Sequence, residues 1–225
     1  MLDRLRRRTP DPPGFDPSRV PDAPRETAVE TANGPFSCHA VTSPDGRWTL
    51  AYGRRADGGE SRVFRLRDGD IDTHFQSAHP AAGAVANDGT VAVVERGESN
   101  TTTSRVRAFV DGTETLDLTL DATVTDVVAS PSGELVAVAT RRPDASVHAY
   151  DTRTGESTWT VTPRRATPRL LGIHGVDEPL VYVSRETRRD PYLAVDPSGE
   201  VAWGNERYQS TRPLTERVRS FVSRD

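Results

Sequence analysis

The chain has 225 residues, and its 33 acidic and 29 basic residues leave a formal net charge of −4. This length suffices for one domain with a sizeable core, while so small a net charge does not by itself indicate a protein that binds polyanions. The single cysteine, Cys38, excludes an internal disulfide and a zinc site built from several cysteines. We interpret Cys38 as a small buried side chain in a strand.

The first 35 residues are predicted to form an arm rich in proline and arginine. Six prolines fall within residues 1–24, which is typical of a flexible segment. A basic stretch followed by prolines stands where a secretion signal would need an apolar core, and no window reaches the roughly 18 apolar residues of a membrane helix. We therefore expect a cytoplasmic protein without a membrane segment. The residues "ETAVETA" at 26–32 are interpreted as an extra strand that could join the first part of the fold to the last.

Two interleaved series of turns follow, each with a period of 43 to 44 residues. The first series contains Gly46, Gly89 and Gly133, and residues 175–179 stand where a fourth turn would fall. The second series contains Gly69, Gly112, Gly155 and Gly199. A repeat of this length indicates stacked structural units.

Short runs rich in β-branched and aromatic residues lie between the turns, such as "TVAVVER" and "ELVAVAT". Runs of this kind between Gly, Pro and Asp are typical of strands. Each unit of 43 to 44 residues is therefore predicted to be a four-stranded antiparallel meander, with its first strand near residues 37–42, 81–86, 124–129 or 169–174. Such sheets, repeated every 40 to 50 residues or so, are typical of β-propeller blades.

Three stretches resemble known propeller repeats. "SPDGRWTLAYG" resembles the repeat of TolB-type propellers. "YDTRTGESTW" and "VDPSGEVAW" resemble a hairpin of WD-like and quinoprotein-type propellers, with Trp159 and Trp203 in the place of its tryptophan. The resemblance covers about residues 36–208 and implies an all-β fold, a small β-propeller of four four-stranded blades. It implies no activity, because propellers serve unrelated functions, and we find no ligand set for a quinone and expect no cofactor.

Several ways of closing a ring are compatible with the sequence. Four blades could close on themselves, the termini could build part of a fifth, composite blade, or two chains could share a ring. We expect a monomer or a dimer that completes the ring. Residues 209–225 place Leu214, Val218, Phe221 and Val222 on one face, which predicts a C-terminal amphipathic helix packed on the propeller.

The meander assigns the charged residues to two opposite rims. The turns that join the first strand to the second and the third strand to the fourth lie on one rim and carry mostly Asp and Glu. The loops on the other rim carry eleven arginines and eight acidic residues. Paired guanidinium groups bind phosphate and carboxylate groups. The candidate binding residues for an anionic or protein partner are Arg54, Arg55, Arg141, Arg142, Arg164, Arg165, Arg188 and Arg189. The alternative is that Asp serves the geometry of its own turns and that the loop arginines only contact solvent.

Catalytic and metal-binding motifs are not found. The five histidines show no metal-ligand spacing, and a nucleophile elbow, a phosphate-binding loop and a dinucleotide fingerprint are all missing. His39 and Asp126 take equivalent positions in their predicted strands, near the expected central channel. Two such groups are too few to hold an ion, so we interpret them as a hydrogen-bonded structural pair.

The sequence therefore predicts a non-catalytic interaction module or scaffold that docks a protein or nucleoprotein partner through its Arg-bearing rim. Nucleic acid is the second candidate partner, although no aromatic residues interleave these arginines as in a single-strand binding platform. The alternative function is a propeller-type hydrolase with an ion in the central channel. Because every basic residue is an arginine, we expect a GC-rich coding sequence, as in a halophilic archaeon or a GC-rich bacterium.

Overall fold

The structure, a computed structural model, describes residues 10–97, 101–141, 143–163, 166–175, 178–185 and 190–211. These residues form four antiparallel sheets that follow one another along the chain, and in each sheet strands adjacent in sequence pair with each other. This is the repeat of a β-propeller. The predicted all-β fold with four meander blades and a short C-terminal helix is confirmed.

The strand boundaries follow the predicted period. The first sheet contains β1 (Arg25–Val29), β2 (Phe36–Thr42), β3 (Trp48–Arg55), β4 (Ser61–Arg67) and β5 (Asp70–Gln76). The second contains β6 (Pro80–Val85), β7 (Val91–Arg96), β8 (Ser104–Val110) and β9 (Thr113–Leu120). The third contains β10 (Val124–Ala129), β11 (Leu135–Thr140), β12 (Val147–Asp151) and β13 (Ser157–Val161). The fourth contains β14 (Pro168–His174), β15 (Leu180–Arg185), β16 (Leu193–Val195) and β17 (Val201–Gly204).

Residues in the left-handed conformation close the tight turns of the sheets. Gly46, Gly89 and Gly133 have φ values of 78°, 87° and 77°, which a residue with a side chain adopts only at a cost. Asp68 and Asp111 have φ values of 51° and 49° and are each followed by glycine. Asp-Gly is the sequence that two-residue hairpin turns prefer, so the two turn series correspond to the two hairpins of each blade.

The core lies between neighbouring sheets. Alternate residues of a strand point to opposite faces, and Trp48, Leu50 and Tyr52 of β3 therefore pack together with Val91 and Val93 of β7. On the other face of the first sheet, Cys38 is buried as expected, and burial raises the pKa of its thiol to about 11. Each blade thus buries one strand face against the next blade.

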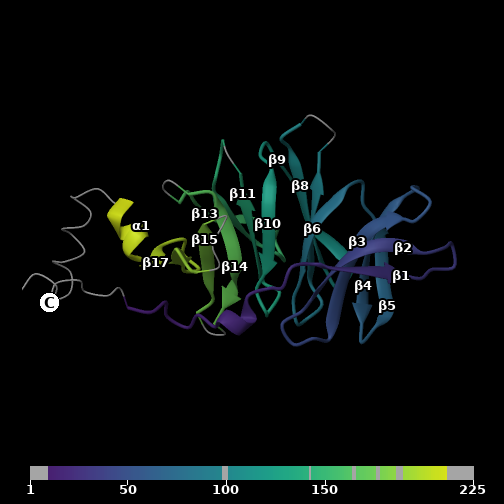
Figure 1. Ribbon diagram of the computed structural model, residues 1–225, viewed down its shortest axis with the longest axis horizontal. Coiled ribbons are helices and arrows are strands. Elements are labelled where there is room, and N and C mark those ends of the chain that lie inside the picture. The colour runs from purple at the N-terminus through teal and green to yellow at the C-terminus, as the bar shows by residue number, and fades with distance from the viewer. Residues whose placement is uncertain are drawn as a thin grey trace, which may run out of the picture.

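The four sheets stand side by side in an open arc, with the first and the fourth at opposite ends (Figure 1). Extensive contacts join the first sheet to the second, the second to the third and the third to the fourth. Among the described residues, no contact of this extent joins the fourth sheet to the first. The sheets therefore do not close into a four-bladed ring, and the described parts of the termini form no fifth sheet.

The N-terminal segment crosses the arc from the fourth sheet to the first (Figure 1). Phe15 and Val20 pack on Leu171 and Tyr182, on the face of the fourth sheet that no other sheet of the described residues covers. The chain then forms a 3-10 helix, η2 (Pro17–Arg19), and enters β1, which pairs antiparallel with β2. The extra strand expected at 26–32 thus overlaps β1 in the first sheet, and the residues before it make the contact with the fourth.

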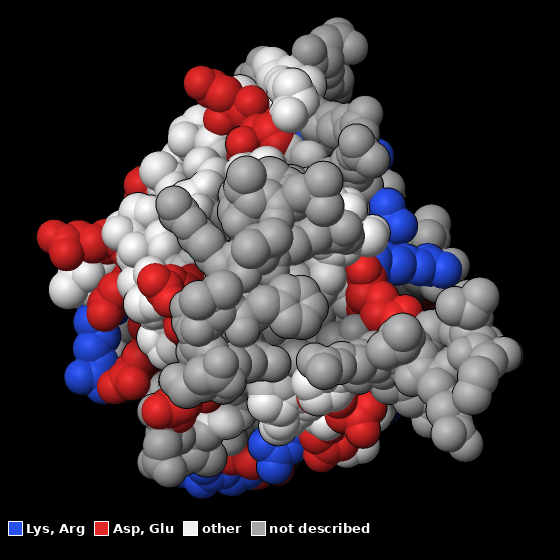
Figure 2. Space-filling view, turned by 90° about the vertical axis from the view of Figure 1, so that its left-hand side faces the viewer, with Lys and Arg blue, Asp and Glu red and all other residues white. Residues whose placement is uncertain are grey.

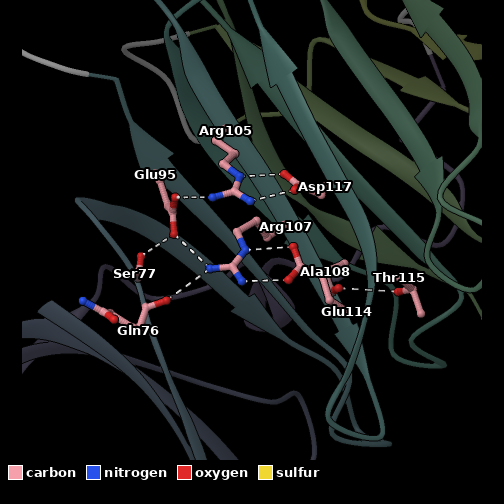
Figure 3. A network of polar contacts seen from close by, with 9 residues as sticks. All are labelled: Gln76, Ser77, Glu95, Arg105, Arg107, Ala108, Glu114, Thr115 and Asp117. Atoms are coloured by element: carbon pink, nitrogen blue, oxygen red, sulfur yellow. Dashed lines mark hydrogen bonds and ion pairs between the residues drawn. The ribbon is translucent and has the colours of Figure 1, made fainter.

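A polar network fastens the second sheet to the end of the first (Figure 3). The carboxylate of Glu95 is buried and accepts hydrogen bonds from Ser77 Oγ at 2.7 Å and from Arg107 Nη1 at 3.2 Å. Arg107 also donates to the carbonyl oxygen of Gln76 at 3.2 Å and to Glu114 at 2.8 Å. A buried charge is tolerated when it is paired and hydrogen-bonded, and this network meets both conditions.

Turns of successive sheets also bond to one another on one rim of the arc. The amide of Asp45 donates to Asn87 Oδ1 at 3.0 Å, and the amide of Asn87 donates to the carbonyl oxygen of Pro131 at 3.1 Å. These two bonds, one to the Asn87 side chain and one between backbone groups, link the first three sheets in addition to their packed side chains.

The chain described after β17 is a short helix, α1 (Glu206–Thr211). The rest of the helix predicted over 209–225 lies outside the described residues. Within the part of the chain that is described, no helix combines the length and the hydropathy that crossing a membrane would require.

Candidate functional site

Three of the eight predicted binding arginines, Arg54, Arg55 and Arg141, belong to the described part of the chain. Arg54 and Arg141 are exposed, and Arg55 donates from Nε to Asp57 at 2.8 Å. The other five, which lie outside the described residues, are Arg142, Arg164, Arg165, Arg188 and Arg189.

When β2–β5 are taken as the first blade and β1 as an added strand, an arginine recurs at or directly after the end of the second strand of every blade. β3 ends at Arg55, β7 at Arg96 and β15 at Arg185, and Arg141 directly follows β11. Sequence reasoning placed Arg96 and Arg185 in these loops but did not select them as binding residues, because it selected arginine pairs rather than positions related by the repeat. The 43 to 44 residue period was the signal that could have found them.

These strand ends share one rim with the loops through which the chain enters the same blade. The amide of Arg96 donates to His79 O at 2.9 Å, and the amide of Arg141 donates to Thr123 O at 2.9 Å. His79 and Thr123 each lie just before the first strand of their sheet. The predicted sorting of these loops onto one rim is therefore confirmed for the second and third blades. We call Arg54, Arg55, Arg96, Arg141 and Arg185 the arginine rim.

The opposite rim carries acidic residues that serve the turns themselves. Asp151 accepts from the amides of Arg153 and Thr154, each at 2.8 Å, and these bonds lower the pKa of its carboxyl. Asp196 accepts from Ser198 in the same way, and its pKa is lowered too. Local turn geometry thus accounts for these two acids.

Charge on the end of the arc that carries the fourth sheet is mixed. Figure 2 shows acidic side chains at several places on the described surface of this end, with basic side chains beside them at the margin. The described surface in this view is therefore not one continuous basic patch.

The second candidate site is the face of the fourth sheet on which the arm lies. The indole N–H of Trp203 donates to Pro10 O at 2.8 Å, and the Tyr182 hydroxyl donates to Pro13 O. The Phe15 ring stacks on His174 with ring centres 5.4 Å apart and meets the Tyr182 ring at 5.0 Å. The sequence predicted a flexible arm here, whereas residues 10–20 are held by specific contacts. We call this face the arm groove.

His174 holds the arm through its imidazole. Its Nδ1 accepts the backbone N–H of Asp16 at 3.3 Å, so Nδ1 carries no proton in this arrangement. The ring is buried, and burial lowers its pKa, with the charge of Arg19 acting in the same direction and that of Asp16 opposing it. The neutral imidazole is therefore the form that binds the arm.

A cavity of about 350 Å³ lies beside the arm groove. The arm contributes Pro10, Asp11 and Pro12 to its wall. The fourth sheet and α1 contribute Arg185, Asp190, Tyr192, Trp203, Asn205, Glu206 and Arg207. The guanidinium of Arg185 lies 5.5 Å from the centre of the Tyr192 ring. This cavity brings one member of the arginine rim next to the arm.

Asp126 lies on β10, the first strand of the third sheet, and its hydrogen bonds differ from the predicted ones. Its carboxylate accepts from the amides of Leu170 and Val127, each at 3.1 Å, and burial raises its pKa to about 6. His39 is exposed, and its ring lies 6.1 Å from that of Tyr52. The expected hydrogen-bonded pair of His39 and Asp126 is therefore wrong. Within the described ranges, no three His, Cys, Asp or Glu residues converge as a metal site.

Comparisons with known proteins show similarity of fold and nothing more specific. No family model matches the sequence, and no curated protein resembles it. The structure is similar to hydrazine synthase from Kuenenia stuttgartiensis, with 17% identity over 73% of this chain and 47% of that one and a TM-score of 0.49. It is also similar to BamB from Moraxella catarrhalis, with 13% identity over 82% and 51% of the two chains and a TM-score of 0.48.

A third similar structure, of a prolyl endopeptidase, has 17% identity over 78% of this chain and 27% of that one, with a TM-score of 0.47. This chain thus spans about half or less of the length of these three proteins.

Proposed function

We propose that the protein is a non-catalytic interaction scaffold that docks an acidic surface of a partner protein on its arginine rim. The observation that carries this proposal is the return of an arginine at the end of the second strand of all four blades. Guanidinium groups spaced along one rim match carboxylates spaced along a partner.

Turn geometry does not account for Arg54. Asp151 and Asp196 are explained by hydrogen bonds to their own turns, but a guanidinium makes no equivalent backbone bond that a turn requires. The side chain of Arg54 is exposed and has no hydrogen-bond or ion-pair partner among the described residues. Other arginines pair with acids, as Arg55 of the rim does with Asp57 at 2.8 Å and Arg105 does with Asp117 at 2.6 Å. Arg54 is thus available to a partner.

The aromatic residues near the arginines favour a protein partner over a nucleic acid. Platforms for single-stranded nucleic acid place aromatic rings where bases can stack. The aromatic ring nearest to an arginine of the rim is Tyr192, and it is buried beneath Arg185. A phosphate backbone could still contact the guanidinium groups, so the test must separate the two classes of partner.

The test is affinity purification of the tagged full-length chain from its native host, with nuclease treatment of half the sample. The rim variant carries Arg54→Gln, Arg96→Gln and Arg141→Gln. The control variant carries Arg25→Gln, Arg47→Gln and Arg153→Gln, which remove the same charge from side chains that are 81%, 59% and 69% exposed.

We expect one protein to co-purify with the wild type and with the control variant, and its recovery to be unchanged by nuclease treatment. With the rim variant its recovery should decrease about tenfold. Recovery should also decrease as the salt concentration rises. Equal recovery with the rim and control variants would overturn the docking proposal. Loss of the partner on nuclease treatment would assign the rim to nucleic acid instead.

A further inference from the structure

The arm groove binds its occupant through the carbonyl oxygens of two prolines. Trp203 Nε1 donates to Pro10 O at 2.8 Å, and the Tyr182 hydroxyl donates to Pro13 O. We propose that the arm groove is a recognition site for proline-rich segments of another protein, and that the chain's own arm is a resident competitor for it.

The donors in the groove suit a proline-rich ligand. Proline has no backbone N–H, so a proline-rich segment offers carbonyl acceptors and apolar rings. Grooves that recognise such segments present aromatic side chains with polar tips, which pack on proline rings and donate to carbonyl oxygens. Trp203 and Tyr182 supply both features, and they lie on two different strands, β17 and β15.

An aromatic anchor sets the position of the ligand in the groove. Phe15 lies nearly parallel to His174, with 5° between the ring planes, and 5.0 Å from the Tyr182 ring. The turn that delivers it is closed by the bond from Phe15 N to Pro12 O at 3.3 Å. Gly14 has a φ of 66° in this turn, so the ligand pattern includes Pro-Pro-Gly followed by an aromatic residue.

The groove has room beyond what the arm contacts. The cavity of about 350 Å³ beside Pro10 and Pro12 is lined on the sheet and helix side by Arg185 and Arg207 and also by Asp190 and Glu206. Asp11 of the arm lines the same cavity. The charge of this lining is mixed, so it is the volume of the cavity that leaves room for a longer partner segment.

The arm competes because it is covalently attached. A tethered ligand acts at an effective concentration in the millimolar range for a short linker, so a partner segment must either bind more tightly or contact more of the cavity. Loosening the arm should therefore raise the apparent affinity for a free peptide.

The test uses the full-length chain and a fluorescent peptide with the sequence of residues 9–20, TPDPPGFDPSRV. The arm variant carries Phe15→Ser, which removes the anchor of the resident arm and leaves the groove intact. We expect the arm variant to bind this peptide at least tenfold more tightly than the wild type does. A peptide carrying F15S is the matched ligand control and should bind at least tenfold more weakly.

A groove variant adds Trp203→Phe and Tyr182→Phe to the arm variant, which removes both donors and keeps an aromatic ring at each position. Its affinity for the peptide should fall about tenfold, because two hydrogen bonds are lost. Equal peptide affinity of the arm variant with and without these two substitutions would overturn the proposal. So would peptide binding that does not depend on the Phe15 ring of the peptide.

A second measurement uses the wild type alone and does not require the variants to fold. Hydrogen exchange at the Asp16 amide, which His174 protects in the bound arm, should accelerate when the peptide is added in millimolar excess. Unchanged exchange at saturating peptide would overturn the proposal. A concentration-dependent dimer whose arms occupy each other's grooves would also overturn it, because the occupant would be a second copy.

Discussion

Trp159 and Trp203 occupy equivalent positions in the third and fourth sheets, yet they meet different neighbours. Trp159 lies opposite Ala149 and Trp203 opposite Ala194 in the two registers. Trp159 packs against the next blade so closely that a Cβ added at Gly199 would lie 2.6 Å from the Trp159 Cβ. Trp203 faces no further sheet among the described residues, and it donates to Pro10 O. The arm therefore stands where a fifth blade would stand.

Removal of the two indole N–H groups should have unequal effects. Trp203→Phe deletes the bond to Pro10 and should lower the free energy of unfolding by about 1 kcal/mol. Trp159→Phe should cost less hydrogen-bond energy, because Trp159 Nε1 is buried without a partner among the described residues. Because Trp159 is buried in the core, its replacement also leaves a cavity. The check is therefore urea denaturation of Trp203→Phe, and an unchanged free energy of unfolding would contradict the assignment of the arm contact.

Two acidic residues of the network in Figure 3 should differ in their importance for stability. Glu95→Gln replaces a carboxylate that is 5% exposed and leaves Arg107 without one of its partners, so we expect a loss of about 2 kcal/mol. Asp117→Asn breaks a pair with Arg105 in which both side chains are more than 40% exposed, so we expect at most about 1 kcal/mol. Equal losses in urea denaturation would show that burial does not decide the outcome.

His174 should make the arm contact weaken in acid. Its pKa is lowered in the folded protein, so the folded state binds fewer protons than the unfolded state. The stabilisation is complete above the unfolded pKa of about 6.5 and is lost as the pH falls below it. We expect the free energy of unfolding of wild type, relative to His174→Asn, to decrease between pH 7.5 and 5.5. A constant difference over this range would contradict the prediction.

Asp126 should act in the opposite direction. Its pKa is raised to about 6 in the folded protein, so the folded state binds more protons and stability is lost as the pH rises from about 4 to above 6. Asp126→Asn removes this loss of stability, which amounts to roughly 3 kcal/mol. The free energy of unfolding of the variant, relative to wild type, should therefore increase between pH 4 and 7. Guanidinium denaturation at several pH values measures it, and a difference that shrinks with pH would refute it.

The blades could be predicted because their signals are local. The glycines at 46, 89 and 133 adopt left-handed turns one period apart, and a turn of this kind is encoded within a few residues. The strands between them follow from β-branched residues in short runs. The open arc could not be predicted in this way, because it depends on which sheets meet.

The arm and the channel were mispredicted for two physical reasons. Proline content indicated a flexible segment, but Tyr182 and Trp203 bind the arm across 169 and 193 residues of sequence, and local composition contains no signal for such contacts. In the channel, the register of β10 shifts between Val124 and Asp126. Because an irregular register breaks strand alternation, alignment of repeats does not give the direction of the Asp126 side chain.

The course of the arm has a consequence for how the molecule unfolds. In an array of repeats, each unit contacts only its neighbours, so the units at the ends can detach one at a time. Here the segment that becomes the edge strand β1 of the first sheet is also anchored on the fourth. Neither terminal blade can unfold without breaking that contact, so the arm connects the two ends of an otherwise linear array. Loss of the arm should therefore convert a single cooperative unfolding transition into stepwise fraying from the ends.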